Sequence, residues 1–330
     1  SAPISGLAYL FYDFNWITWL IINSAVGILF LGMFITFGFA VAQQLNDMKL
    51  LALQQQVKLT EAYQRFVPQQ LLKNLGKDSI LDVSLGDQVN VEMSILFSDI
   101  RSFTSISEKM TPKENFSFLN SYLNQMSPII RENKGYIDKF MGDGVMALFK
   151  SSANDSIKAA IGMQRYLKQY NSNSFKNKTH KINIGIGINT GEMMLGTLGD
   201  VNRMEGSVIS DAVNLASRLE GLTKIYKVGI IISEETYNNI NKDLFNTRFI
   251  DVVAVKGKDK PVKIFEIFDS DLDKLKHLKI DTLGDFKEAV SDYFQKNFKK
   301  ALKLFLKINK INPHDKVTEI YINRCQKIIK

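Results

Sequence analysis

The sequence predicts an α+β domain with an apolar helix before it and a helical tail after it. Between about residues 88 and 268, short apolar runs of strand length alternate with longer runs in which apolar residues recur at helical spacing. This alternation is typical of an α/β sandwich, in which helices pack on a sheet. An uncharged apolar run precedes this region, and apolar stripes at helical spacing follow it.

The composition suits a globular protein with one very apolar segment, and it limits the kinds of site that the chain can contain. Hydrophobic residues make up 45% of the 330 residues, and the formal net charge is +8. The single cysteine, Cys325, rules out a disulfide within the chain, and three scattered histidines rule out a zinc site built from cysteine and histidine. Lysines at helical spacing near the C-terminus fit a solvated helix face. They also suit an anionic membrane or nucleic acid, although we expect no nucleic acid.

Residues 14–42 are predicted to form a transmembrane helix. They carry no charge and exceed the roughly 20 apolar residues that span a bilayer. Lysines follow this run but do not precede it, so residues 1–13 are expected outside the cytoplasm and the remainder of the chain inside. The run is too long for a signal peptide, which leaves a buried soluble helix as the alternative. We predict a single-pass protein of the cell (inner) membrane, and because the chain starts at Ser1 we expect a receptor portion upstream.

Residues 43–87 are predicted to be a helical signalling linker. Residues 43–66 contain no glycine or proline, which favours a helix that continues from the membrane segment. Pro68 then permits only a short helical turn, and the boundary to the central domain falls near Gly86 and Asp87.

The central domain, residues 88–268, is expected to alternate strands and helices. A capping box with proline at the first helical position, Thr111-Pro112-Lys113-Glu114, begins a helix that continues towards Ile130. The remaining expectations are a strand over residues 93–97, two strands around Asp143, a turn at Gly191 into residues 192–198, helices over 155–170 and 209–222, and strands over 182–189, 228–233, 249–255 and 261–268.

Residues 269–330 are expected to form a helical tail. Ala301 and Phe305, followed by Pro313, resemble a tetratricopeptide hairpin. One such unit cannot bury its apolar face alone, so it should dock on the central domain, on another copy of the chain or on a partner. A plain pair of terminal helices is the alternative.

Two aspartates stand at the ends of apolar runs in the central domain. Asp99 comes just past the strand-like run Met93–Phe97, and Asp143 lies in an Asp-Gly turn between two strand-like runs. Each aspartate alone also fits an ordinary structural role: Asp99 would cap the next segment, and Asp143 would form a turn. Together, two carboxylates at adjacent strand ends would hold a hard divalent cation, and Mg²⁺ is usually bound by one or two carboxylates plus substrate phosphates. The pair therefore predicts a site for a metal ion and a phosphate.

Two common nucleotide-binding loops are excluded. The chain has no glycine-rich loop that ends in Gly-Lys-Ser or Gly-Lys-Thr, so it is not a P-loop NTPase. The glycines between Gly185 and Gly191 lie within a strand-like run, and the third one is a residue too far along for a dinucleotide-binding loop.

A polar pair on a predicted helix suits phosphate chemistry. Asn214 and Arg218 are spaced i, i+4 and therefore share one helix face. A fixed guanidinium can stabilise charge that develops on a phosphate, and an amide can hold a sugar. A surface stripe is the alternative, with Arg218 paired to Glu220 or Asp211.

Five motifs follow one another along the central domain. They are FSDIRSFT at 97–104, DKFMGDGVMALF at 138–149, GINTGEMMLGTLG at 187–199, SVISDAVNLASRLE at 207–220 and VKGK at 255–258. In order and spacing they resemble the class III nucleotidyl cyclases, the catalytic domains of adenylate and guanylate cyclases. The resemblance implies an antiparallel-sheet fold of ferredoxin-like lineage that forms a head-to-tail homodimer, with each active site shared across the interface.

The resemblance also implies which residues bind metal. Asp99 and Asp143, with the backbone carbonyl of Ile100, would hold two Mg²⁺ or Mn²⁺ ions in a two-metal arrangement for in-line displacement. The ribose 3′-hydroxyl would attack the α-phosphate, and pyrophosphate would leave.

Further residues of the motifs would bind the nucleotide. From the opposite protomer, Asn214 would orient the ribose, Arg218 would stabilise the α-phosphate and Lys256 would bind the outer phosphates.

Other motif residues would contact the substrate and select its base. Phe103 and Thr104 lie in the first motif and are expected to contact the substrate. Lys139 occupies the position that reads the purine, where lysine is similar to adenylate cyclases and glutamate to guanylate cyclases. Its partner is Ser207, where many adenylate cyclases carry aspartate or threonine.

The sequence as a whole predicts a membrane-anchored, homodimeric adenylate cyclase that acts in signal transduction. Its layout resembles bacterial sensor cyclases, in which a membrane receptor portion precedes a linker and the cyclase. The alternatives are a guanylate cyclase and a non-catalytic module that binds nucleotide, or that dimerises and acts as a scaffold through its helical tail.

Overall fold

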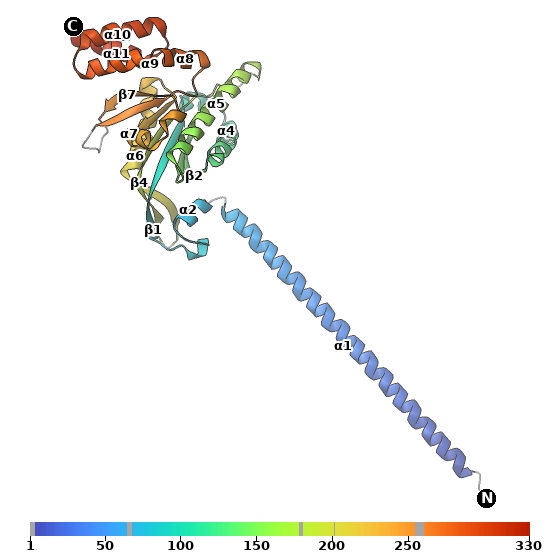
Figure 1. Ribbon diagram of the computed structural model, residues 1–330. Coiled ribbons are helices and arrows are strands. Elements are labelled where there is room, and N and C mark those ends of the chain that lie inside the picture. Colours follow the sequence, from blue (N-terminus) through green and yellow to red (C-terminus); the bar gives the residue numbers. More distant parts are fainter. Residues whose placement is uncertain (1–3, 65–67, 178–180, 201, 255–260) are drawn as a thin grey trace. The chain divides into compact units, whose positions relative to one another are not determined.

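The computed structural model describes residues 4–64, 68–177, 181–200, 202–254 and 261–330. Contacts divide the chain into two compact units, Ser1–Val67 and Pro68–Lys330. The helices are α1 (Ile4–Gln64), α2 (Gln69–Asn74), α3 (Phe103–Ser107), α4 (Pro112–Glu132), α5 (Ala153–Asn177), α6 (Asp211–Tyr226), α7 (Glu234–Asn239), α8 (Asp273–Asp281), α9 (Leu283–Phe294), α10 (Phe298–Ile311) and α11 (Lys316–Ile329), with short 3-10 turns at Ile80–Asp82 and Lys242–Leu244 (Figure 1).

Helix α1 is the whole of the described part of the first unit. The predicted membrane segment and the first part of the predicted linker form one continuous helix. Its stretch Asn15–Tyr63 is long and apolar enough to cross a membrane. The side chains of residues 15–63 are exposed.

A mixed sheet forms the centre of the second unit. Its strands are β1 (Gln88–Ile100), β2 (Gly135–Met141), β3 (Gly144–Phe149), β4 (Ile184–Gly199), β5 (Met204–Ile209), β6 (Ile230–Ser233), β7 (Thr247–Val253) and β8 (Val262–Ile267). The strand order is β2-β3-β1-β4-β6-β8-β7, and β5 pairs with β4 beside this path. Among the described residues β4 and β6 are parallel, whereas the other strand pairs are antiparallel. The predicted α+β class is confirmed, with one parallel pair in a sheet that was expected to be antiparallel.

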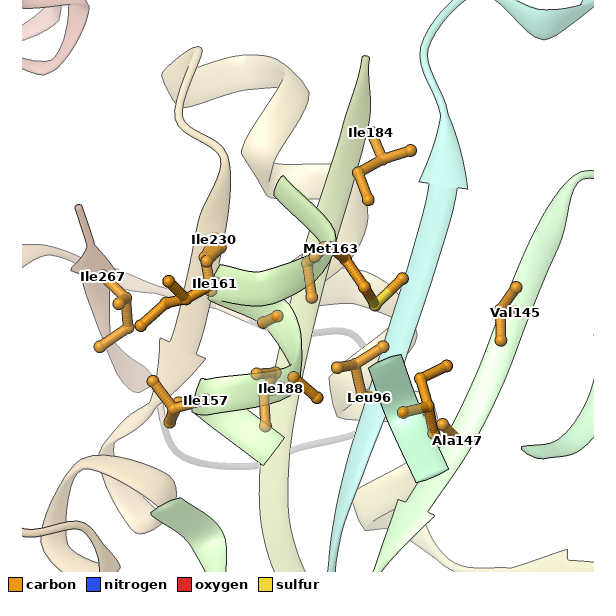
Figure 2. Close-up of a cluster of buried hydrophobic side chains, with 14 of the residues drawn as sticks. Leu96, Val145, Ala147, Ile157, Ile161, Met163, Ile184, Ile188, Ile230 and Ile267 are labelled. Carbon is orange, nitrogen blue, oxygen red and sulfur yellow. The ribbon is translucent and has the colours of Figure 1, made fainter. Parts of the chain in front are cut away.

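Helices cover both faces of the sheet. Alternate residues of a strand point to opposite faces, so neighbouring positions of β1 enter different clusters. Leu96 packs with α4 and α5, and Figure 2 shows Ile157 and Ile161 of α5 close to the strand residues. Ile95 packs with Ala216 of α6 on the other face.

Two glycines of β4 allow this second layer to pack closely. A Cβ atom at Gly187 would collide with the backbone of α6 at Ala216 and Glu220, and one at Gly185 would collide with the side chains of Arg101 and Thr223. The sequence analysis excluded a dinucleotide loop here, and the structure assigns these glycines to close packing between a helix and a strand.

The structure corrects several predicted boundaries. Strand β1 continues through Ile100, so Asp99 lies within the strand, opposite Gly185, rather than past its end. Gly191 is not a turn, because it pairs with Met93 in the middle of β4. Strand β5 was not predicted, and Ile209 ends it instead of beginning the helix that follows. In each case hydrogen-bonded pairing with a neighbouring strand, and not the apolar run alone, sets where the strand begins and ends.

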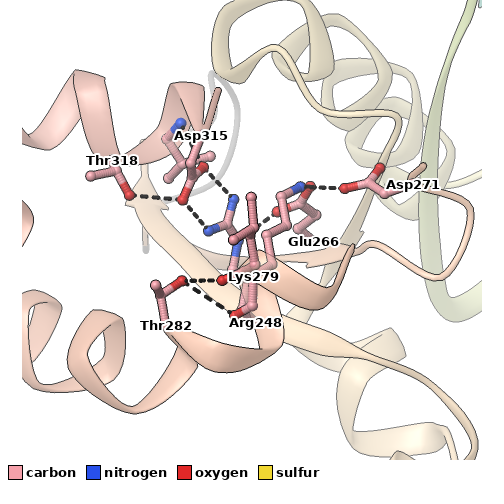
Figure 3. Close-up of polar contacts among 9 residues, drawn as sticks. Arg248, Glu266, Asp271, Lys279, Thr282, Asp315 and Thr318 are labelled. Atoms are coloured by element: carbon pink, nitrogen blue, oxygen red, sulfur yellow. Dashed lines mark hydrogen bonds and ion pairs between the residues drawn. The ribbon is translucent and has the colours of Figure 1, made fainter. Parts of the chain in front are cut away.

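The tail docks on the sheet through buried charges (Figure 3). Arg248 of β7 donates from Nε to Glu266 Oε2 at 2.6 Å, and from Nη1 and Nη2 to the two carboxylate oxygens of Asp315 at 2.6 and 2.7 Å. Lys279 of α8 donates to Glu266 Oε1 and to Asp271 Oδ2, both at 2.6 Å. Of the predicted docking sites, the tail therefore uses the central domain of its own chain. Its tetratricopeptide character stays a prediction.

Replacement of Arg248 by methionine should lower the free energy of unfolding by about 3–5 kcal/mol, because it leaves the buried Asp315 carboxylate without its counter-ion and leaves Glu266 with Lys279 alone. Lys263→Met is the matched control: Lys263 is half exposed and pairs with Glu234 at 2.7 Å. An exposed pair contributes at most about 1 kcal/mol. Urea unfolding of the full chain in mild detergent, followed by circular dichroism, measures both. Equal losses in the two variants would contradict this account.

Candidate active site

The structure brings Asp99 and Asp143 together. Strand β1 pairs with β3 as far as Ser98 opposite Val145, so the last residues of β1 lie beside the turn that joins β2 to β3. Gly142 makes this turn with a φ of +65°, a conformation that suits glycine. Asp143 Oδ2 accepts a hydrogen bond from the backbone nitrogen of Ile100 at 3.2 Å. The three predicted metal ligands therefore lie at one edge of the sheet.

The site carries an excess of negative charge. Burial, and then the negative charge of Asp99, raise the pKa of Asp143 to about 6. Burial also raises the pKa of Glu220 to about 7; Arg101 opposes this rise, and Asp99 and Asp143 add to it. A bound cation would relieve this repulsion.

The ligand set suits a hard divalent cation that also binds substrate. Among the described residues no group of three histidine, cysteine, aspartate or glutamate side chains could enclose a metal ion. Two carboxylates and a carbonyl leave several coordination positions for water or phosphate oxygens, which is how Mg²⁺ is usually bound. The residues present therefore fit the predicted ions.

Arg101 and Glu220 link α6 to the carboxylate edge, the edge of the sheet that carries Asp99 and Asp143, and this contact was not predicted. Arg101 Nη1 lies 3.2 Å from Glu220 Oε1, and Nη2 donates to Thr223 Oγ1. The sequence allows Glu220 to pair with Arg218. Glu220 faces Arg101 instead, and because this contact joins residues 119 positions apart, no local sequence pattern indicates it.

Asn214 and Arg218 share an exposed face of α6. No hydrogen bond or ion pair to either side chain occurs within the part of the chain that the structure describes. Residues in a helix are separated by about 100° around its axis, so Arg218 and Glu220 point about 200° apart. Because Glu220 faces the carboxylate edge, Arg218 faces away from Asp99 and Asp143 of its own chain.

Lys139 and Ser207 lie on strands whose side chains meet. Lys139 is on β2, and its Nζ atom is 3.6 Å from Oε1 of Glu205, which lies two residues before Ser207 on β5. Ser207 is half-buried and pairs with Gly196 of β4.

The remaining residues that were predicted to bind the substrate are Phe103, Thr104 and Lys256. The ring of Phe103 stacks on Phe118 of α4, with centroids 6.3 Å apart, and it packs in the apolar cluster under that helix. Thr104 is exposed at the start of α3. Lys256 lies outside the described residues.

Comparisons with known proteins identify the fold and the motifs. The family described as the adenylate and guanylate cyclase catalytic domain matches residues 87–264. A terminal-differentiation-specific adenylate cyclase of Dictyostelium discoideum is 38% identical over 287 residues, which is 85% of this chain and 13% of that protein. An adenylate cyclase of Anabaena cylindrica is 40% identical over 238 residues, which is 69% of this chain and 47% of that protein. The chain thus spans less than half the length of both relatives.

Two solved structures are also similar. The adenylyl cyclase CyaB from P. aeruginosa superposes with a TM-score of 0.51 at 37% identity, over 56% of this chain and 98% of that one. A bacterial light-regulated adenylyl cyclase superposes with a TM-score of 0.58 at 26% identity, over 66% of this chain and 63% of that one. The resemblance to class III cyclases found in the motifs is confirmed.

Mg²⁺ or Mn²⁺ should raise the melting temperature of the protein at about pH 7.5, and this rise should shrink towards about pH 5.5. The reason is that a proton competes for Asp143, whose pKa is raised to about 6, and only the ionised carboxylate binds metal. Asp143→Asn should abolish the rise. Asp273→Asn, an exposed carboxylate on α8, should keep it. If Mg²⁺ or Mn²⁺ still raised the melting temperature of Asp143→Asn, the predicted metal site would be contradicted.

Proposed function

The chain belongs to the adenylate and guanylate cyclase catalytic domain family, and we propose that it is the catalytic part of a membrane-anchored adenylate cyclase. It converts ATP to 3′,5′-cyclic AMP and pyrophosphate as a homodimer. One observation carries this proposal: the carboxylate pair Asp99 and Asp143 lies at one edge of the sheet, while Arg218 faces away from it and the exposed Asn214 and Arg218 side chains have no partners in the described residues. Each chain then carries two different half-sites.

A second copy of the chain completes each site. The half-site on α6 presents an amide and a guanidinium to solvent, and a head-to-tail dimer brings them to the partner's carboxylates. Exposed apolar side chains on the β4–β5 arm support such an interface, since they would lose their contact with water in it. These are Met194, Leu198, Met204 and Ile209.

Asp99, Asp143 and the carbonyl of Ile100 would hold two Mg²⁺ or Mn²⁺ ions. When bound, such ions polarise phosphate oxygens and make the ribose 3′-hydroxyl a better nucleophile. The raised pKa of Asp143 is consistent with a carboxylate that is charged most readily when a cation is present.

Residues of the partner chain bind the nucleotide. The Arg218 guanidinium stabilises the charge that develops on the α-phosphate, and such a fixed donor is worth more in the transition state than in the bound substrate. Asn214 orients the ribose by hydrogen bonding, so that the 3′-hydroxyl stands in line with the leaving pyrophosphate. Lys256 binds the outer phosphates.

ATP is the proposed substrate, with GTP as the second candidate. Lys139 is a donor without acceptor capacity, and the two relatives with 38% and 40% identity are named adenylate cyclases. A receptor-type guanylate cyclase of Caenorhabditis elegans is only 26% identical, over 230 residues. Ser207 keeps GTP in consideration, because its hydroxyl can donate as well as accept.

The membrane part of the proposal rests on α1. We assign residues 14–42 to a single span, residues 43–87 to a linker that relays a signal, residues 88–268 to the catalytic domain in the cytoplasm, and residues 269–330 to the tail. The length and apolar character of Asn15–Tyr63 support this assignment. A non-catalytic role is disfavoured, because Asp99, Asp143, Asn214 and Arg218 are all present.

The membrane fraction of cells that express the full chain should form cyclic AMP from ATP faster than cyclic GMP from GTP. The reason is that Lys139 donates to the unprotonated ring nitrogen of adenine. Assays with each nucleotide, and with Mg²⁺ and Mn²⁺ in turn, measure the preference. Faster turnover of GTP would overturn the assignment of substrate, and activity confined to the soluble fraction would overturn the membrane anchor.

Asp99→Ala and Arg218→Ala should each be nearly inactive, yet their co-expression should restore about a quarter of the activity if dimers form at random. A hybrid dimer then contains one site with both halves intact. The matched control is co-expression of Asp99→Ala with Asp143→Ala, which damages the same half in both chains and should restore nothing. Absence of recovery in the first pair would count against shared sites.

A further inference from the structure

A β-bulge in β2 turns two consecutive side chains to the same face of the sheet. The pairing of β2 with β3 shifts between Ile137 and Lys139, so Asp138 is the extra residue of the bulge. Ile137 packs in the cluster under α4 and α5, whereas Lys139 pairs with Met146, whose side chain belongs to the cluster on the opposite face. A bulge locally re-aims side chains. Asp138 and Lys139 therefore both leave the face of Ile137.

The Asp138 carboxylate is buried beside an ammonium. Its side chain is only 4% exposed, and its Oδ2 atom lies 3.6 Å from Nζ of Lys139. Among the described residues no group donates a hydrogen bond to this oxygen. Burial raises the pKa of Asp138, and the charge of Lys139 opposes this rise. A buried carboxylate is costly unless a cation remains close to it, so Asp138 and Lys139 depend on each other.

Glu205 offers a direct comparison. Its Oε1 atom is also 3.6 Å from the Lys139 ammonium, but its side chain is 61% exposed. An ion pair screened by water contributes little, whereas a buried one is strong and holds its geometry. Of these two carboxylates, Asp138 is the one that can fix the position of Lys139.

We propose that Asp138 is a positioning residue that holds the Lys139 ammonium where the base of the nucleotide binds, and so sets the preference for ATP over GTP. The inference rests on the proposed function. A fixed ammonium can donate to the unprotonated ring nitrogen N1 of adenine, whereas guanine carries a hydrogen there. A lysine that is free to move can turn to the carbonyl oxygen of guanine instead, and the discrimination is lost.

The experiment compares Asp138→Asn with Glu205→Gln in the full chain, using ATP and GTP as substrates. Both substitutions keep the shape and remove the negative charge, and both carboxylates lie at the same distance from the same ammonium. Asp138→Asn should raise KM for ATP and lower the ratio of kcat/KM for ATP to that for GTP by about tenfold or more. Glu205→Gln should change this ratio by less than about threefold.

A double-mutant cycle with Lys139→Ala distinguishes positioning from a general structural role. In the Lys139→Ala background, Asp138→Asn should have no further effect on the ratio, because Asp138 acts through the ammonium. An additive effect would overturn the proposal, as would an unchanged ratio in the single variant. The melting temperature of Asp138→Asn should change little, because the Lys139 ammonium that remains is one-third exposed and keeps Glu205 at 3.6 Å. A marked fall would show a structural role and would also overturn it.

The same assays distinguish a failure of the proposed cyclase function from a failure of the proposal about Asp138. A wild-type chain that forms no cyclic nucleotide would refute the proposed function together with this inference. A wild-type chain that forms cyclic AMP, with an unaltered preference in Asp138→Asn, would refute the inference alone.

Discussion

The close packing of α6 against β4 is the constraint on which the catalytic unit depends. Gly187 lets the helix backbone approach the strand, since a side chain there would collide with it. The contact of Arg101 with Glu220 and Thr223 then holds the rotation of the helix about its own axis. With Glu220 turned towards the carboxylate edge, Arg218 must face away from it. A single helix therefore determines that the two halves of the proposed site in one chain point in different directions.

The carboxylate edge carries negative charge that the protein does not neutralise, and this excess charge suits its proposed role as a metal site. Asp99 and Asp143 are close enough that one raises the pKa of the other, and the guanidinium of Arg101 is engaged by Glu220. The protein therefore leaves negative charge for a cation to neutralise. If protein groups had neutralised this site, it would bind metal ions more weakly, and through them it would also bind the phosphates of a nucleotide more weakly.

Much of the fold could be predicted, because local patterns and pairing agree. The capping box at Thr111 and the hairpin around Asp143 occur where the sequence indicates, and the helix that carries Asn214 is present with its start moved from Ile209 to Asp211. The errors at Asp99, Gly191 and strand β5 share one cause, since strand ends are set by hydrogen bonds to neighbours distant in sequence. The docking of the tail also depends on contacts between residues that are distant in sequence. Arg248 pairs with Asp315, 67 positions further along the chain, and no local pattern predicts that contact.

By itself the sequence determined which chemical groups are present and in what order, because the cyclase motifs occupy continuous stretches of chain. It thereby predicted a site that contains the carboxylates, the amide and arginine of α6, and the lysine of β2. Only the tertiary structure decided where these groups point. The Arg101–Glu220 contact spans 119 positions, and the bulge that places Asp138 beside Lys139 depends on the register of β2 with β3. Direction and burial are properties of packing, and packing joins residues that the sequence keeps apart.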